Sequence, residues 1–104
     1  MTPDFKAIGA EIGALVQEKN AAYGDSFAKS GDFLRLLYPD GIRPEQYGDA
    51  LVLVRMFDKQ MRIAHKKGAF GESEFGDLVG YAILGLANDR REAAIAARVE
   101  GMPS

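Results

Sequence analysis

The sequence predicts a small all-α domain with three long helices and one short helix. Apolar residues recur every three or four positions over long stretches, which is the spacing of one helix face. Glycine and proline separate those stretches, and no apolar–polar alternation is long enough to indicate a strand. The 104 residues suit a single domain, 1–104, which can bury only a modest core. We therefore expect a helical bundle that is completed by oligomerisation.

The first long helix is expected to begin at Thr2-Pro3-Asp4, because Thr2 can cap a helix and proline suits its first turn. Helical spacing of apolar residues then continues to Lys19 or Asn20. Gly9 and Gly13 weaken this helix, but their four-residue spacing could let another backbone come close.

Three further helices are expected in the rest of the chain. Proline opens the second long helix, and basic residues and then glycine close it, as is usual at helix ends. Whether the third long helix breaks near Asn88-Asp89 is left open. The expected ranges are 33–38 for the short helix, from Pro44-Glu45 to about Lys67 for the second long helix, and from Glu72 or Ser73 to about Val99 for the third.

Composition excludes several classes of protein. The net charge is −2 and basic residues are spread along the chain, which disfavours a binder of duplex nucleic acid. Cysteine is absent and His65 is the single histidine, so carboxylates would have to hold any metal, which favours Mg²⁺ or Mn²⁺. We expect a cytoplasmic protein, because no apolar run suits a signal peptide or a membrane span.

The second long helix places an acid among bases at the edge of its apolar face. Asp58 has Arg55 and Arg62 three residues before and four after it, with Lys59 alongside. An acid directed toward a core is costly unless it is paired or binds a cation. Two interpretations stay open: an intrahelical salt bridge of Asp58 with either arginine, or a metal-ligating carboxylate with guanidinium groups that hold phosphate.

The third long helix is apolar or small nearly all round over residues 78–87, as expected for a helix buried on both sides. Polar groups in such a helix need partners. Glu74 and Asp77 lie three apart and can address one cation together, facing the basic group of the second helix. One face of the helix carries Glu74, Asp77, Tyr81, Leu84 and Asn88.

Polar residues also fall on the apolar side of the first helix, namely Lys19, Asn20 and Tyr23. They could belong to a site, or the lysine could extend to solvent and the tyrosine could be part of the core. Facing carboxylates with arginines nearby suit phosphoanhydride hydrolysis, in which Mg²⁺ bridges phosphate oxygens and activates a water.

These features resemble the MazG-like all-α nucleoside triphosphate pyrophosphohydrolases, a superfamily that includes dimeric dUTPases and dCTP pyrophosphatases. More closely, they resemble small phage and bacterial proteins grouped as nucleotide-modification-associated domains. The resemblance covers roughly residues 10–90. It rests on residues 19–27, on 55–59 with Arg62, and on 71–73 followed by Asp77 and 80–82.

The superfamily pattern pairs ExxE on one helix with ExxD on the next, and together these hold Mg²⁺ above the triphosphate. Residues 74–77 match the second half, whereas Arg55 stands where the first glutamate of the first half belongs. The resemblance implies catalytic Asp58, Glu74 and Asp77, with Glu72 as a further metal ligand. It implies a substrate-binding set of Lys19, Asn20, Tyr23, Arg55, Lys59, Arg62, Tyr81 and Asn88, of which Asn20 and Tyr23 contact the base or sugar and Lys59 and Arg62 the phosphates.

The leading hypothesis is therefore a Mg²⁺- or Mn²⁺-dependent hydrolase, assembled as a dimer or tetramer, that converts a (deoxy)nucleoside triphosphate to monophosphate and pyrophosphate. The alternative is a non-catalytic helical module that binds a nucleotide or a protein, with the same charges forming a structural ion-pair network. A third hypothesis is a phage-type accessory protein that works through residues 89–100.

Overall fold

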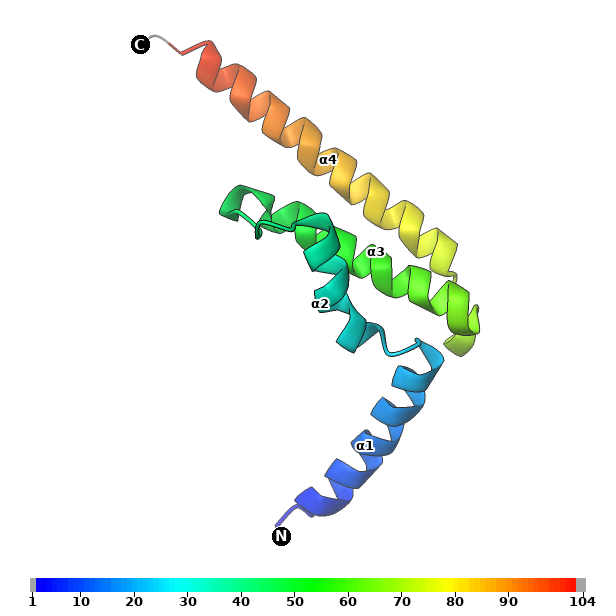
Figure 1. Ribbon diagram of the computed structural model, residues 1–104. Helices are drawn as coiled ribbons and strands as arrows, with labels where there is room; N and C mark the ends of the chain where they lie inside the picture. The colour runs from blue at the N-terminus through cyan, green and yellow to red at the C-terminus, as the bar shows by residue number, and fades with distance from the viewer. Residues whose placement is uncertain (1, 103–104) are drawn as a thin grey trace.

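The computed structural model describes residues 2–102, and these residues confirm the all-α prediction (Figure 1). No strand occurs within that range. Short turns join four α-helices, and two of the connections contain a single turn of 3₁₀ helix. The α-helices are α1 (Phe5–Ala22), α2 (Ser26–Leu37), α3 (Tyr47–Lys66) and α4 (Glu74–Glu100), and the 3₁₀ turns are η1 (Pro44–Gln46) and η2 (Ala69–Gly71).

Both ends of α1 lie further along the chain than the sequence suggests. Asp4 is the N-cap in place of Thr2, because its carboxylate accepts a hydrogen bond of 3.0 Å from the backbone N–H of Ala7. Aspartate is at least as good a capping residue as threonine. The helix then continues past Asn20 to Ala22, since alanine has the highest helix propensity.

α2 is longer than the predicted short helix and begins at Ser26. Apart from Phe27, its first half consists of small and polar residues without apolar periodicity, which is why sequence spacing does not reveal it. Its second half packs on α3, where the rings of Phe33 and Phe57 stack with centroids 4.4 Å apart. This contact with α3 holds a segment that local propensity favours only weakly.

The two remaining long helices agree with their predicted ranges to within a few residues. η1 and α3 together span Pro44 to Lys66. The side chain of Ser73 caps α4 by accepting a hydrogen bond from the N–H of Gly76 at 3.3 Å. α4 runs through Asn88-Asp89 without a break, because each of these residues costs at most about 0.7 kcal/mol in a helix.

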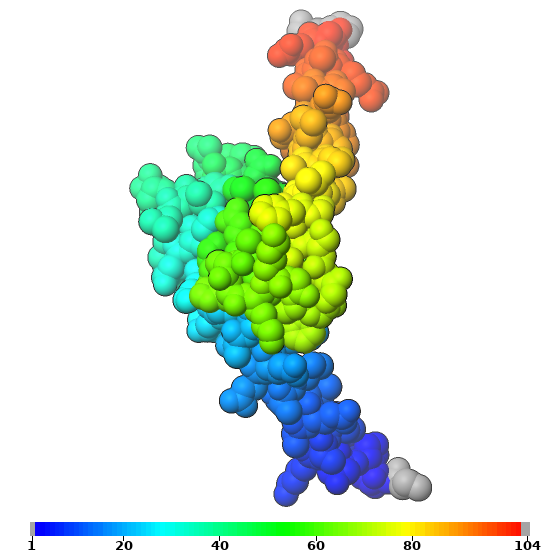
Figure 2. Space-filling view, turned by 90° about the vertical axis from the view of Figure 1, so that its right-hand side faces the viewer, coloured from blue at the N-terminus to red at the C-terminus, as the bar shows by residue number. Residues whose placement is uncertain are grey.

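α3 is the central helix of the molecule. α2 packs on one side of it and α4 on another, whereas α1 meets it only near its C-terminal end (Figure 1). In the space-filling view, α1 and the last turns of α4 project from the body in opposite directions (Figure 2). The three long helices therefore do not lie side by side within one chain, since α1 points away from α3 and α4.

The core of the single chain is thin. Among the described residues, the only buried apolar side chains are Ala22 and Ala50, and no large side chain is fully buried. The α4 segment 78–87, expected to be buried on both sides, exposes 58–61 % of Val79, Ile83 and Leu84. No helix within residues 2–102 combines the length and apolar character that a membrane crossing needs.

The turn between α1 and α2 requires an unusual backbone. Gly24 and Asp25 follow one another with φ of 64° and 59°, the left-handed region. The imidazole of His65 on α3 lies where a Cβ at position 24 would project. Only glycine at this position satisfies both the backbone angle and the contact with α3.

We predict that Gly24→Ala lowers the free energy of unfolding by roughly 1–3 kcal/mol, because alanine is strained at positive φ and collides with His65. Gly9→Ala is the matched control: Gly9 lies within α1 with open space around it, so this change should raise stability by up to about 1 kcal/mol. Urea unfolding measures both variants. A Gly24→Ala protein as stable as wild type would contradict the described turn.

Candidate functional site

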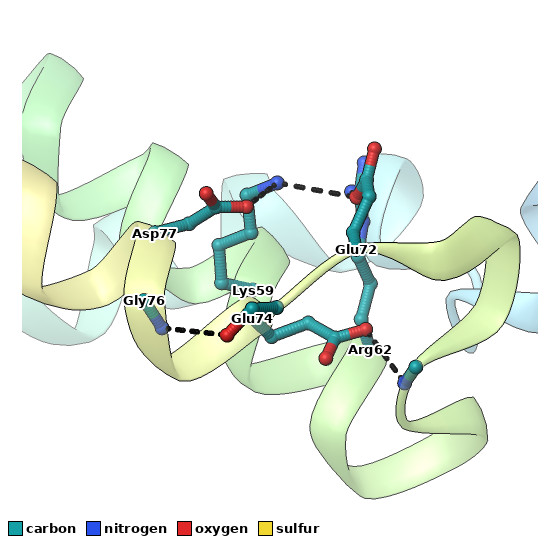
Figure 3. A network of polar contacts seen from close by, with 8 residues as sticks. Lys59, Arg62, Glu72, Glu74, Gly76 and Asp77 are labelled. Carbon is teal, nitrogen blue, oxygen red and sulfur yellow. Dashed lines mark hydrogen bonds and ion pairs between the residues drawn. The ribbon is translucent and has the colours of Figure 1, made fainter.

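Four charged side chains form an ion-pair network where α3 meets the start of α4 (Figure 3). Lys59 Nζ lies 2.8 Å from Asp77 Oδ2 and 3.5 Å from Glu72 Oε2. Arg62 Nη1 contacts the same oxygen of Glu72. The lysine and arginine side chains are only 12 % and 18 % exposed, so these pairs are shielded from solvent on the basic side.

Local structure explains why these residues meet. Lys59 and Arg62 are three apart on α3 and so share one face of it. Glu72 is extended, with φ of −85° and ψ of 152°, and directly precedes the cap of α4. Asp77 lies in the first turn of α4, where an acid is also favoured by the helix dipole. The return of the chain through η2 brings the acids over the bases.

An aromatic cluster lies beside the network and connects it to α1. The guanidinium carbon of Arg62 is 3.9 Å from the ring centroid of Tyr23. Tyr23 in turn packs edge-on against Phe70, with centroids 5.8 Å apart, and Lys19 Nζ lies 5.8 Å from the Phe70 ring. Arg62 is therefore held between an aromatic face and the carboxylate of Glu72, a geometry that suits a planar guanidinium.

Glu74 is the most buried charged residue among those described, at 2 % exposure. Its Oε1 accepts a hydrogen bond of 2.9 Å from the backbone N–H of Gly68, which has φ of 74°. The carboxylate thus links the first turn of α4 to the turn that ends α3. The Glu74 carboxylate therefore pairs with a backbone N–H. Asp77, the other acid of the ExxD motif, pairs with the Lys59 side chain instead.

The structure brings together part of the predicted metal-ligand set. Glu72 and Asp77 converge on one cation, the Lys59 ammonium. Glu74 turns toward Gly68. Asp58 is half-buried on α3 and forms neither of the intrahelical salt bridges considered for it, because the ion pairs found in residues 2–102 involve other acids. Within this range no three acidic or histidine side chains are grouped as a metal site would require.

The predicted substrate-binding residues fall into separate regions. Lys59, Arg62 and Tyr23 belong to the network and its aromatic neighbour. Arg55 is exposed on α3 and Asn88 is half-buried on α4. Tyr81 lines a groove between α3 and α4, to which Tyr38 also contributes.

Asn20 lies in a second pocket, of about 510 Å³, at the junction of α1 and α2. Its side-chain amide donates a hydrogen bond of 3.1 Å to Asp25 Oδ1. Sequence reasoning did not select Phe27, which is 90 % exposed in this pocket although it is a large aromatic residue. The sequence feature that could have indicated Phe27 is its position directly after the turn, at the end of the segment 19–27. The pocket is lined by Val16, Lys19, Asn20, Tyr23, Asp25, Ser26 and Phe27.

No protein-family model matches the chain, and comparison with curated proteins and with solved structures also yields no match.

The charges around Lys59 act on its pKa in opposite directions. Burial is the largest effect and lowers the pKa, while the hydrogen bond to Asp77 raises it. Repulsion from Arg62 lowers the pKa, and the charges of Glu72 and Asp77 raise it. The balance is a pKa above the ordinary 10.5, so Lys59 stays protonated through the neutral range.

We predict that the ion pairs of Lys59 stabilise the fold below about pH 10.5 and that this contribution is lost at higher pH. A raised folded-state pKa means that the native chain retains its proton longer than the unfolded chain. The stability difference between wild type and Lys59→Met should therefore be constant from pH 7 to 9 and shrink above pH 10.5. Urea unfolding along this pH series measures it, and a difference that grows with pH would contradict the pairing.

We also predict that Glu74→Ala lowers the free energy of unfolding by about 1–3 kcal/mol, because it leaves the N–H of Gly68 without its acceptor. Glu74→Gln retains a side-chain oxygen at the same place and should cost less. Thermal unfolding of the two variants separates loss of the acceptor from loss of the charge. Equal stability of Glu74→Ala and wild type would exclude a structural role for this contact.

Proposed function

We propose that the chain is a metal-dependent hydrolase that converts a (deoxy)nucleoside triphosphate to monophosphate and pyrophosphate, acting as a homo-oligomer. The observation that carries this proposal is the convergence of Glu72 and Asp77 on the ammonium group of Lys59, with Arg62 beside it. Carboxylates on one side and partly buried bases on the other are the components that phosphoryl chemistry uses.

Two of the four predicted acids fit a magnesium site. Glu72 Oε2 and Asp77 Oδ2 both face the position that the Lys59 ammonium takes, and Mg²⁺ is commonly held by one or two carboxylates together with substrate phosphates. Glu74 does not fit in this arrangement, because its carboxylate is buried against Gly68. When bound, Mg²⁺ would offset phosphate charge and lower the pKa of a bound water.

The bases and the α1–α2 pocket supply complementary contacts. Lys59 and Arg62 would exchange their carboxylate partners for phosphate oxygens, and Tyr23 would keep the guanidinium plane oriented as it does so. Asn20 gives one amide hydrogen to Asp25, which leaves its carbonyl oxygen and second hydrogen for the edge of a base. The exposed ring of Phe27 offers a stacking surface in the same pocket.

A non-catalytic nucleotide- or protein-binding module is the second candidate. It is favoured by the neutralisation of Glu72 and Asp77 by Lys59 and Arg62, and by the absence of a group of three acids within residues 2–102. Such a network can serve fold specificity without any chemistry. The two candidates differ in whether a product is released.

We predict pyrophosphate release when the chain is incubated with a panel of NTPs and dNTPs in the presence of Mg²⁺ or Mn²⁺. Asp77→Ala should abolish the release, because it removes one of the two carboxylates that would hold the metal and that pair with Lys59 here. Glu92→Ala, which changes an exposed acid on the same helix, should leave the rate unchanged. Coupled detection of pyrophosphate gives the rates and identifies the preferred base.

Thermal unfolding with nucleotide, with and without Mg²⁺, separates the remaining outcomes. Stabilisation by nucleotide without pyrophosphate release would favour the binding module, since any ligand of the native state raises stability by mass action. If nucleotide causes no pyrophosphate release and no thermal stabilisation, nucleotide recognition at this network is refuted.

A further inference from the structure

A single chain exposes far more surface than a compact protein of its mass. The accessible area is 8096 Å². A folded monomer of 11.3 kDa exposes about 5,700 Å². The radius of gyration is 19.2 Å, against about 13 Å for a compact domain of this length. The excess of about 2,400 Å² is at the upper end of what one subunit contributes to an obligate homodimer interface.

Part of this exposed surface is a row of apolar side chains on one face of α1. Their positions in the helical repeat place them on one side of α1, and they are 43–72 % exposed. α1 points away from α3 and α4, so its own chain leaves the row uncovered (Figures 1 and 2). We call these residues the α1 row: Phe5, Ile8, Ile12, Leu15 and Val16.

A groove lies between α3 and α4, which diverge toward the N-terminal end of α3 (Figure 1), and its lining is mainly apolar but includes Asp49 and Asp89. Its volume is about 440 Å³, and α3 lines it with Val52 and Met56. On α4 the groove is formed partly by Ala82 and Gly85, which are too small to fill it. Leu86 also lines the groove and is 51 % exposed.

The groove continues onto an uncovered face of α4 whose dimensions match the α1 row. Phe75, Val79 and Leu86 follow one another at helical spacing and are 51–60 % exposed. From Phe75 to Leu86 is eleven residues, as it is from Phe5 to Val16, so each row is about 16 Å long. The two rows offer comparable apolar surfaces of equal length.

We propose that α1 of a second copy of this chain lies in the α3–α4 groove and along the adjoining face of α4, and that the contact is reciprocal. A two-fold axis gives each copy one α1 to donate and one groove to fill, so the assembly closes. The same chain cannot fill its own groove: only residues 23–25 separate α1 from α2, and Gly24 meets α3 at His65, at the opposite end from the groove.

This interface goes beyond the proposed reaction and does not depend on it. The interface would bury the α1 row and the α4 face together and so remove two exposed apolar surfaces from water. Assembly can be measured without nucleotide or metal, so its outcome is separate from that of the pyrophosphate assay.

The absence of cysteine allows a direct test by cross-linking. Ile12→Cys and Leu86→Cys variants are prepared separately, mixed, and treated with a short bis-maleimide. We expect a covalent dimer in the mixture and little in either variant alone, because each cross-link joins α1 of one copy to the groove of another. Cross-linking of Ile12→Cys alone would indicate α1–α1 pairing and overturn the proposal. Absence of any cross-link, with a monomeric mass, would also overturn it.

A second pair of variants tests the energetics. Ile12→Asp should raise the dissociation constant at least about 100-fold, because it places a charge in both copies of the buried row. Ala14→Asp introduces the same charge on the opposite face of α1 and should leave the mass in solution unchanged. Light scattering measures both, and circular dichroism checks that each variant is helical. The proposal would be overturned if both variants dissociated to the same extent, or if neither dissociated more readily than wild type.

Discussion

Lys59 lies at the centre of the contact between α3 and α4, with Asp77 and Glu72 around its ammonium group. In most small domains such a contact would be secondary to an apolar core, but here the buried apolar side chains of the described residues are two alanines. The start of α4 is therefore positioned largely by polar groups: the network on one side and Glu74 on Gly68 on the other. Loss of a partner would leave a shielded charge without compensation, which is costly.

The carboxylates also hold the bases in place. Partly buried bases are poorly hydrated, so they gain strongly from anionic partners such as Glu72 and Asp77, for which phosphate would compete in the proposed reaction. Tyr23 and Phe70 connect this junction to the end of α1. The orientation of α1 and the geometry of Arg62 are thus coupled through one aromatic contact, and a partner that covers α1 would also restrain the arginine.

Periodicity was sufficient to predict the helical class and the approximate ranges of α1, α3 and α4. It could not reveal the first half of α2, whose stability depends on the contact of Phe33 with Phe57 rather than on its own pattern. Helical wheels predicted that Glu74 and Asp77 share one face of the helix, and they do so in α4. The wheels could not show that the N–H of Gly68 would donate to the carboxylate of Glu74, because that contact depends on the positive φ of the turn before α4. Glu72 lies outside any helix, so its pairing with Arg62 depends on loop geometry that no wheel describes.

α3 contacts each of the other α-helices. α2 and α4 pack along it, and α1 meets it beside the Gly24 turn, where His65 lies against the glycine. Disorder that starts at the free end of α1 or of α4 would therefore reach the other helices only through α3, whereas a disturbance of α3 would spread through the whole chain.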